Sequence, residues 1–254
     1  MYETIIVEKN DKIATIFLNR PEKLNAMNFT MKKELASVVQ ELEKDDSVAV
    51  VIVTGKGRGF CAGADLSETM GKKVFANDGR QRMRNGFPLY KTVANSDKIY
   101  IAAINGAASG SGLSLACWCD FRIASENAKL GMPFVDIGLL PDGGLLYTLP
   151  RLIGVAKTKE LAMQAEKIDA GKALELGLLT KVVKAEELEI KVKEFAEKVA
   201  SKSYIALALT KNLLNRTFEL ASDNLLEMEA SAQDICFSSE YHNSAITSIL
   251  EKKK

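Results

Sequence analysis

Apolar and polar residues alternate over the first part of the chain. The stretch YETIIVEKNDKIATIFLN (residues 2–19) alternates on both sides of an Asn-Asp pair, which predicts a β-hairpin. Residues 28–46 instead carry apolar side chains at helical spacing and predict an amphipathic helix. The apolar positions of this predicted helix include Leu35, Val38, Val39 and Leu42.

Two apolar runs farther along the chain each end at a glycine-rich turn. SVAVVIVTG (47–55) and KIYIAAING (98–106) are expected to be buried strands, and a helix from about Gly110 follows the second. Residues 70–95 between them have a polar helical pattern, and residues 120–133 contain two short strands. Strands and helices therefore alternate in this part of the chain, as they do in an α/β protein.

The character of the sequence changes from Lys157 onward. Successive helical patterns follow one another, interrupted by one short strand at LTKVV (179–183). We therefore expect a strand-rich α/β core over residues 1–195 and a helical region over residues 196–254.

The composition is that of an ordinary globular protein. Apolar residues make up 47% of the 254 residues, and 34 basic residues nearly balance 33 acidic ones, giving a net charge of +1. A chain without a broad basic field does not favour nucleic acid as a partner. No apolar run approaches the ~20 residues that span a bilayer, and the N-terminus does not resemble a signal peptide. We therefore expect no nucleic-acid or membrane partner and a cytoplasmic location.

Metal and hydrolase chemistry find little support in the sequence. Cys117 and Cys119 have the wrong spacing for a redox or zinc motif, and His242 is the only histidine. Without a cluster of histidines and cysteines we expect no metal site, and a serine hydrolase would depend on that one distant histidine.

Glycines gather in two turns, VTGKGRGFCAGADL (53–66) and AINGAASGSGL (103–113). Neither contains the Gly-Lys-Ser/Thr of a P-loop, and neither fits the GxGxxG pattern of a dinucleotide site. One interpretation is a pair of ordinary tight turns. The other is an oxyanion hole, in which two backbone N–H groups from separate segments converge on one oxygen and glycines allow its close approach.

Five stretches in a fixed order give the chain its resemblance to a known family. They are LNRPEKLNAMN (18–28), VVIVTGKGRGFCAGADL (50–66), IAAINGAASGSGLSLACWCDFRIAS (101–125), GLLPDGG (138–144) and LPRLIG (149–154). With these stretches the sequence resembles the crotonase superfamily, the enoyl-CoA hydratase/isomerase family. The resemblance implies an α/β fold, a crotonase-like spiral of ββα repeats with an α-helical C-terminal trimerisation region. It also implies a homotrimer or a dimer of trimers.

The same resemblance implies an oxyanion hole for the carbonyl of an acyl-CoA thioester, with the backbone N–H groups of Ala64 and Ser111 as donors. The family usually has glycine where this chain has Ser111. A serine keeps the N–H, provided that the backbone there does not need a positive φ. Coenzyme A enters as part of the substrate, so no separate cofactor is expected.

The resemblance further assigns the positions that bind the substrate. They are Lys23, Leu24, Ala26, Ala62, Asp65 and Leu66 along the CoA portion, together with Gly110, Ser114 and Phe134. Asp65 could equally be a helix N-cap. The three terminal lysines lie in the region that the family places near the CoA phosphates, although a solvated tail is the alternative. Residues 67–97 would largely set the acyl preference.

Family hydratases use two glutamates as acid and base, and this chain has Ser114 and Phe134 at the matching positions. Neither side chain can do that work, which argues against two-glutamate hydration. Three nearby carboxylates are alternatives. Asp120 closes the predicted helix and is expected to be structural, while Asp136 could face either way.

Asp142 is the strongest candidate because it matches the aspartate that isomerase-type members place beside the acyl chain. A proline before it and two glycines after it would fix a turn that aims the side chain, although a purely turn-forming or capping aspartate is the alternative. An apolar setting should raise its pKa and make it a better base. The apolar sequence neighbours expected to form that setting are Phe134, Leu139, Leu140, Leu145 and Leu146.

The sequence therefore favours an enzyme that shifts a double bond in an enoyl-CoA thioester. One carboxylate can move the proton from C2 to C4 while the oxyanion hole holds the dienolate. The alternatives are a hydratase with atypical acid and base residues, and a non-catalytic acyl-CoA-binding scaffold, because a fold does not settle the chemistry.

Overall fold

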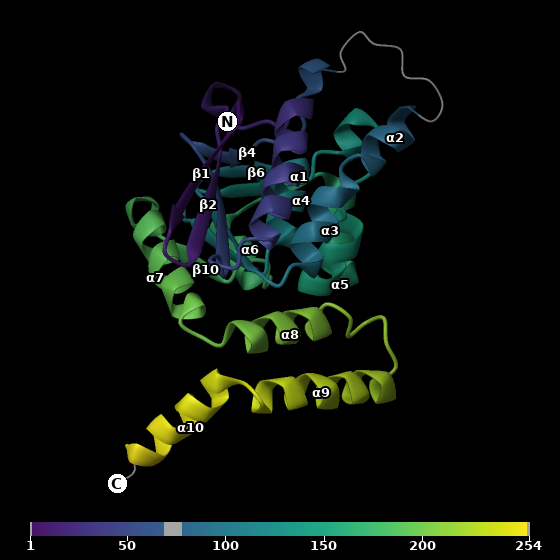
Figure 1. The fold of residues 1–254 in the computed structure, drawn as a ribbon. Helices are drawn as coiled ribbons and strands as arrows, with labels where there is room; N and C mark the ends of the chain where they lie inside the picture. Colours follow the sequence, from purple (N-terminus) through teal and green to yellow (C-terminus); the bar gives the residue numbers. More distant parts are fainter. Residues whose placement is uncertain (1, 69–77, 253–254) are drawn as a thin grey trace.

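Two β-sheets form the centre of the molecule (Figure 1). The computed structural model describes residues 2–68 and 78–252. Within these residues the larger sheet has the strand order β1-β2-β3-β5-β7-β10, and the smaller sheet has the order β4-β6-β8-β9. The larger sheet consists of β1 (Ile5–Asn10), β2 (Ile13–Leu18), β3 (Val50–Gly55), β5 (Ile99–Ile104), β7 (Phe121–Ser125) and β10 (Lys181–Val183). The smaller sheet consists of β4 (Gly59–Cys61), β6 (Ala107–Ser109), β8 (Lys129–Gly131) and β9 (Lys167–Asp169).

A repeated strand–strand–helix unit builds both sheets. In each unit the first strand joins the larger sheet and the second joins the smaller one, as in the pairs β3 and β4, β5 and β6, and β7 and β8. β3, β5 and β7 lie parallel, which requires the crossovers that the helices supply. These helices are α1 (Phe29–Glu43), α2 (Asp78–Arg84), α3 (Phe87–Asn95), α4 (Ser111–Trp118), α5 (Leu145–Gln164) and α6 (Ala170–Glu175). Short 3₁₀ turns are η1 (Pro21–Lys23), η2 (Leu66–Glu68), η3 (Val135–Ile137) and η4 (Ala185–Glu187). The expected spiral of ββα repeats is confirmed.

The N-terminal hairpin and the helix after it form as the sequence pattern predicts. β1 and β2 pair antiparallel, and β2 then pairs parallel with β3. The side chain of Asn28 accepts a hydrogen bond from the Met31 N–H and so caps the start of α1. The apolar stripe of α1 is buried in the core at Leu35, Val38, Val39 and Leu42.

Two elements differ from the sequence prediction. α5 already begins at Leu145, before the change of pattern at Lys157, and the non-helical backbone of Gly154 kinks it. β9 lies where only helices were expected, and it pairs antiparallel with β8. A strand of three residues with one buried side chain, Ile168, is too short to show a period. Of the helical stretch expected over residues 70–95, α2 and α3 are present, while residues 70–77 lie outside the described part, as do Lys253 and Lys254.

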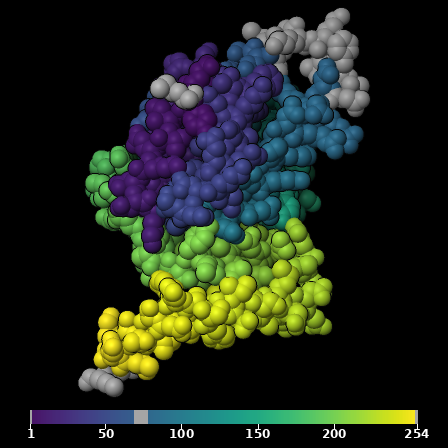
Figure 2. All heavy atoms as spheres, in the orientation of Figure 1, coloured from purple at the N-terminus to yellow at the C-terminus, as the bar shows by residue number. Residues whose placement is uncertain are grey.

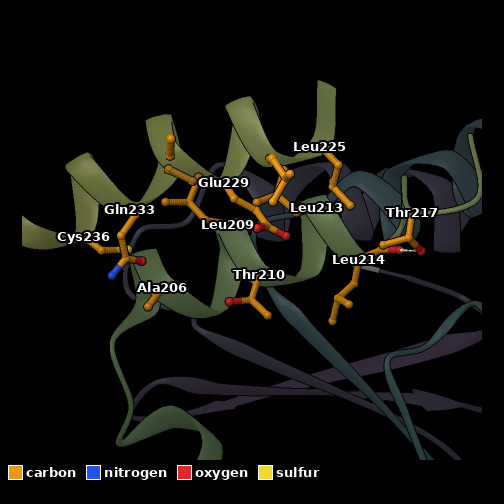
Figure 3. A pocket seen from close by; sticks show the side chains of 13 residues that line it. Ala206, Leu209, Thr210, Leu213, Leu214, Thr217, Leu225, Glu229, Gln233 and Cys236 are labelled. Carbon is orange, nitrogen blue, oxygen red and sulfur yellow. Dashed lines mark hydrogen bonds between the residues drawn. The ribbon is translucent and has the colours of Figure 1, made fainter. Parts of the chain in front are cut away.

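The C-terminal helices are α7 (Leu188–Ala200), α8 (Tyr204–Leu214), α9 (Ser222–Phe237) and α10 (Glu240–Glu251). α7 packs against one face of the larger sheet through Leu188, Val192 and Ala196. α8 lies beneath the core, and α9 and α10 form an outer layer beyond it (Figures 1 and 2). α9 and α10 bury no residue completely, and residues of α8 and α9 line a groove of about 550 Å³ (Figure 3). Within the described ranges, no helix is long and apolar enough to cross a membrane.

Candidate functional site

The two glycine-rich turns of the sequence meet in space. A Cβ atom added to Gly63 would lie 3.0 Å from the carbonyl oxygen of Ser109 and 3.8 Å from the Cα atom of Gly110. Both glycines also have positive φ angles, of 109° and 51°. Glycine is therefore required where the two backbones approach each other. The residues that follow this contact are Ala64 in one turn and Ser111 in the other.

The N–H groups of Ala64 and Ser111 are both free of backbone partners in the described chain. Met27 binds the segment around Ala64 through its N–H to the Gly63 carbonyl, at 2.7 Å, and through its carbonyl to the Asp65 N–H, at 3.0 Å. In this parallel bridge the N–H of Ala64 faces away from Met27. Ser111 is the first residue of α4, so its N–H has no acceptor within the helix. Its φ is not positive, which meets the condition set for a serine at this position.

The segment expected to bind CoA lies against the first of these turns. Asn25 is fully buried, and its side-chain amide donates hydrogen bonds to the carbonyls of Lys56, at 2.9 Å, and Gly59, at 2.8 Å. The Leu24 carbonyl in turn accepts a hydrogen bond from the Ala62 N–H, at 2.9 Å. The fold thus brings the positions singled out in the sequence together at one place: Lys23, Leu24, Ala26, Ala62, Ala64, Asp65 and Leu66.

Asp65 has a structural role that the sequence left open. One carboxylate oxygen accepts hydrogen bonds from the N–H and hydroxyl of Ser67 at the start of η2, and the other lies 2.9 Å from the guanidinium of Arg20. The Ser67 hydrogen bond, followed by that of Arg20, lowers the pKa of Asp65. The carboxylate therefore caps this turn, and the side chain is buried, whereas Lys23 and Leu66 beside it are exposed.

The two positions that match the hydratase glutamates are both occupied by buried, uncharged side chains. Ser114 is fully buried on α4, and its hydroxyl lies within hydrogen-bond distance of the Gly110 and Asp142 carbonyls. Phe134 lies with its ring against Gly110, since an added Cβ there would be 3.6 Å from the ring. Neither position supplies a carboxylate to the site.

Asp142 lies in a turn immediately before α5, partly buried and close to two cations. Burial raises the pKa of its carboxyl group, and the charges of Lys32 and Arg82 oppose that shift. Burial, and then the charge of Arg82, lower the pKa of Lys32 itself. The Asp142 charge also contributes, after burial, to raising the pKa of Tyr90. The carboxylate thus lies in a setting that is part apolar and part cationic.

Lys32, Arg82 and Tyr90 are the residues of this site that the sequence pattern did not identify. They come from α1, α2 and α3, far from Asp142 along the chain. Arg82 also lies over the ring of Phe29, with its guanidinium carbon 5.0 Å from the ring centre. For Lys32, the signal in the sequence is its position on the helix of residues 29–43, next to Met31, which is buried.

The apolar residues expected around Asp142 differ in exposure. Phe134 and Leu145 are buried, whereas Leu139, Leu140 and Leu146 are 53%, 67% and 53% exposed. The charged residues that act on the carboxyl group come from α1 and α2, which lie far from Asp142 along the chain.

Asp120 and Asp136, the other two candidate carboxylates, lie in different environments. Asp120 accepts hydrogen bonds from the Tyr100 N–H, at 2.7 Å, and from the Lys211 ammonium, at 3.0 Å, so its expected structural role is confirmed. Asp136 is exposed on η3.

A large groove of about 1100 Å³ lies between β1–β3 and α7, and its lining includes neither Asp142 nor the two free N–H groups.

The sequence model of the enoyl-CoA hydratase/isomerase family matches residues 8–254. This chain belongs to that family. The resemblance based on the glycine-rich turns is confirmed, and so is the fold that it implied.

Relatives within the family carry different names. The chain is 40% identical to a short-chain-enoyl-CoA hydratase of Clostridium acetobutylicum, over 98% of this chain and 95% of that protein. It is 33% identical to a 1,2-epoxyphenylacetyl-CoA isomerase of Escherichia coli, over 100% of this chain and 97% of the relative. The crystal structure of an enoyl-CoA hydratase from Bacillus anthracis superposes with a TM-score of 0.93 at 34% identity, covering 98% of this chain and 97% of the other.

Proposed function

We propose that this member of the enoyl-CoA hydratase/isomerase family shifts the double bond of an enoyl-CoA thioester, with Asp142 as its single acid–base group. The observation that supports this proposal is the presence of Ser114 and Phe134 at the positions of both hydratase glutamates, while the backbone of the partly buried Asp142 lies within hydrogen-bond distance of the Ser114 hydroxyl. Because burial raises the pKa of that carboxyl group, it is better suited to exchanging protons with carbon.

The substrate would lie with its thioester carbonyl oxygen between the N–H groups of Ala64 and Ser111. Asp142 then removes a proton from C2 of a 3-enoyl-CoA, and the electron pair moves to give a dienolate. Two N–H donors aimed at the enolate oxygen stabilise that charge, and each is worth roughly 3–4 kcal/mol of the barrier. The protonated carboxyl group returns its proton to C4, which leaves a 2-enoyl-CoA and the original carboxylate.

The CoA portion would bind along the segment that contains Lys23, Leu24 and Ala26, with Ala62, Asp65 and Leu66 facing it. Leu66 and Lys23 are exposed beside this segment. Gly110 and Phe134 would contact the thioester end of the acyl group, since they lie where the two turns meet.

Hydration is the second candidate, because one of the relatives described above is named a short-chain-enoyl-CoA hydratase at 40% identity. Under that alternative Asp142 would activate water and another group would protonate C2. A non-catalytic acyl-CoA-binding protein is the third possibility, and it is distinguished by binding without turnover.

The test supplies 3-enoyl-CoA and 2-enoyl-CoA separately and follows the absorbance of the conjugated thioester. A rise from the 3-enoyl substrate supports isomerisation, and loss of the signal from the 2-enoyl substrate supports hydration. Asp142→Asn should lower isomerase kcat by about 10²–10⁴-fold, because it removes the proton-transfer group. CoA-thioester binding should change little. An Asp142→Asn variant with near wild-type turnover would show that the acid–base group lies elsewhere.

A further inference from the structure

The turn that carries Asp142 is attached to one face of α4 by two side chains. The Ser114 hydroxyl lies 3.0 Å from the Asp142 carbonyl oxygen, and the indole N–H of Trp118 donates to the Gly143 carbonyl at 2.7 Å. Ser114 and Trp118 are four residues apart, so they project from the same side of the helix. Two consecutive peptide carbonyls of the turn are therefore held from a single helical face.

The fit between the turn and this face is close. A Cβ atom added to Gly143 would lie 2.8 Å from the Ser114 hydroxyl and 2.9 Å from the Tyr90 hydroxyl oxygen. A Cβ atom added to Gly144 would lie 2.5 Å from the Trp118 ring. The glycines adopt positive φ angles of 60° and 86°, so the backbone itself reaches the helix surface. Nothing larger than hydrogen separates the turn from α4.

The same helix begins with the second N–H group of the proposed oxyanion hole. Ser111 and Ser114 are three residues apart, which corresponds to about 4.5 Å along the helix axis. α4 therefore carries the Ser111 N–H, one proposed oxyanion donor, and also holds the backbone of Asp142, whose carboxylate would move the proton. Reactions that depend on two groups lose rate when either one moves, by up to about 10²-fold for a displacement of 1 Å.

We infer that Ser114 and Trp118 are positioning residues that hold the Asp142 carboxylate in register with the Ser111 N–H. This inference rests on the proposed function. Ser114 stands where family hydratases have a reacting glutamate, and it supplies a neutral hydrogen-bond donor instead. The proposed acid–base group is Asp142 on the neighbouring turn. Trp118 is held in turn by stacking between Tyr90 and Tyr147, with ring centres 6.3 and 5.6 Å away.

Removing the Ser114 hydroxyl leaves no carbonyl of the turn without a partner. The Asp142 carbonyl also accepts a hydrogen bond from the Leu145 N–H, at 3.1 Å, and the Gly110 carbonyl accepts one from the Ser114 N–H, at 2.9 Å. Ser114→Ala should therefore fold, and its main effect should be on the orientation of the turn. Trp118→Phe keeps an aromatic ring in the stack and removes only the donor.

The experiment compares kcat, KM and thermal unfolding of Ser114→Ala, Trp118→Phe and Asp142→Asn with the wild-type protein. We expect each positioning variant to lose on the order of tenfold in isomerase kcat, with KM within about twofold. The matched control is Ser125→Ala, which removes another buried hydroxyl, one that accepts from the Asn127 N–H at 3.2 Å in a different repeat. This control should keep its kcat.

A double-mutant cycle separates positioning from general packing. If Ser114 acts through Asp142, Ser114→Ala should cost much less in the Asp142→Asn background than in the wild-type background. Unchanged kcat in both positioning variants, or equal losses in the two backgrounds, would overturn the inference. If Asp142→Asn itself keeps its activity, the proposed function fails. If Asp142→Asn is inactive and the positioning variants are not, only this inference fails.

Discussion

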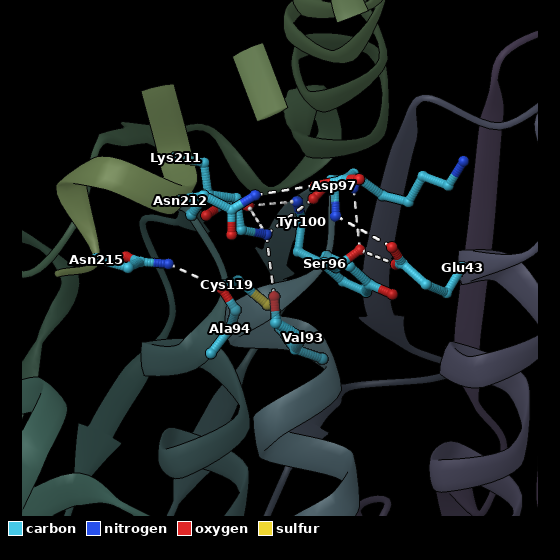
Figure 4. Close-up of polar contacts among 12 residues, drawn as sticks. Glu43, Val93, Ala94, Ser96, Asp97, Tyr100, Cys119, Lys211, Asn212 and Asn215 are labelled. Atoms are coloured by element: carbon cyan, nitrogen blue, oxygen red, sulfur yellow. Dashed lines mark hydrogen bonds and ion pairs between the residues drawn. The ribbon is translucent and has the colours of Figure 1, made fainter. Parts of the chain in front are cut away.

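Two of the junctions at which side chains donate hydrogen bonds to backbone carbonyls differ in charge. The turn junction joins Ser114 and Trp118 of α4 to the turn at Asp142. The α8 junction joins Lys211 of α8 to the core (Figure 4). Both fix one segment of chain against another, yet one uses only neutral donors and the other uses an ammonium group.

The α8 junction is built around a buried charge. The Lys211 ammonium donates to the carbonyls of Val93, at 3.0 Å, and Lys98, at 2.8 Å, and pairs with the Asp120 carboxylate at 3.0 Å. The two charged side chains are 5% and 17% exposed. Asn212 and Asn215 donate to groups nearer the surface, as Figure 4 shows. This polar contact helps to hold α8 to the core, whereas α7 packs on the larger sheet through apolar side chains.

The two junctions differ in their effect on nearby charge. Lys32 and Arg82 already oppose the rise in the Asp142 pKa that burial causes, and a cation in the turn junction would lower that pKa further. Neutral donors fix the backbone without adding to that effect. No proton-transfer group lies at the α8 junction, so a charge is tolerated there as long as it is paired. The two junctions should therefore respond differently to mutation, one mainly in rate and the other mainly in stability.

The largest expected effect on stability is at the α8 junction. Lys211→Met removes the cation and leaves the Asp120 carboxylate partly buried without its partner, which should lower the free energy of unfolding by roughly 3–5 kcal/mol. Urea unfolding measures this loss, and kcat per folded molecule should stay near that of the wild type. A double variant that also carries Asp120→Asn should recover part of the lost stability, because the unpaired charge is then absent.

The destabilisation in Lys211→Met should depend on pH in a defined direction. Burial raises the pKa of Asp120 and the Lys211 charge opposes that shift, so removing Lys211 raises the pKa in the folded protein further. A carboxyl group with a raised pKa loses stability as pH increases from its unfolded pKa through its folded pKa. The stability gap between variant and wild type should therefore shrink as pH is lowered. A gap that widened instead would contradict this account of the pair.

The turn junction should be sensitive to shape rather than charge. Gly144→Ala adds a Cβ atom 2.5 Å from the Trp118 ring at a φ of 86°. Backbone strain and overlap together should cost roughly 2–4 kcal/mol and also lower kcat. Gly138→Ala is the matched control, since Gly138 has a φ of 71° but no atom within 4 Å of the added Cβ. It should cost only the strain of about 1–2 kcal/mol. Equal losses in the two variants would mean that contact with Trp118 is unimportant.

A smaller effect should appear in the pH profile when a cation near Asp142 is removed. Lys32 lowers the pKa of Asp142 against the effect of burial, so Lys32→Met should raise that pKa. The base form is the active form of the carboxylate, and the acidic limb of kcat/KM should therefore move to higher pH. Lys33→Met, an exposed neighbour on the same helix, is the control and should leave the limb in place. A limb that did not move in Lys32→Met would indicate that another group titrates.

Much of the fold was predictable because its signals are local. Apolar runs identified the parallel strands, and the helical spacing of apolar residues identified α1. β4, β6 and β9 have three residues each and show no period, so only the repeat itself could place them. The start of α5 was missed, although Leu145, Thr148 and Leu149 are buried at helical spacing.

The candidate site was predictable only in part. The two glycine-rich turns indicated paired N–H groups, and the resemblance indicated Asp142. The charges around Asp142 come from α1 and α2, and no spacing along the chain brings Lys32 or Arg82 to that turn. The contacts of Ser114 likewise arise only when α4 and the turn are packed together. Long-range packing therefore determines the properties of the site that matter most for its chemistry.

The smallest expected effect distinguishes the two aspartates that the sequence left as alternatives. Asp136→Asn changes an exposed carboxylate on η3, so stability should change by less than about 0.5 kcal/mol and isomerase kcat by no more than about twofold. The comparison with Asp142→Asn is informative because both variants make the same chemical change and the two residues lie close together in the sequence. If Asp136→Asn instead lost activity as severely as Asp142→Asn is expected to, the acid–base role would have to be shared or moved. Rates of both variants on 3-enoyl-CoA, measured in one series, decide between these outcomes.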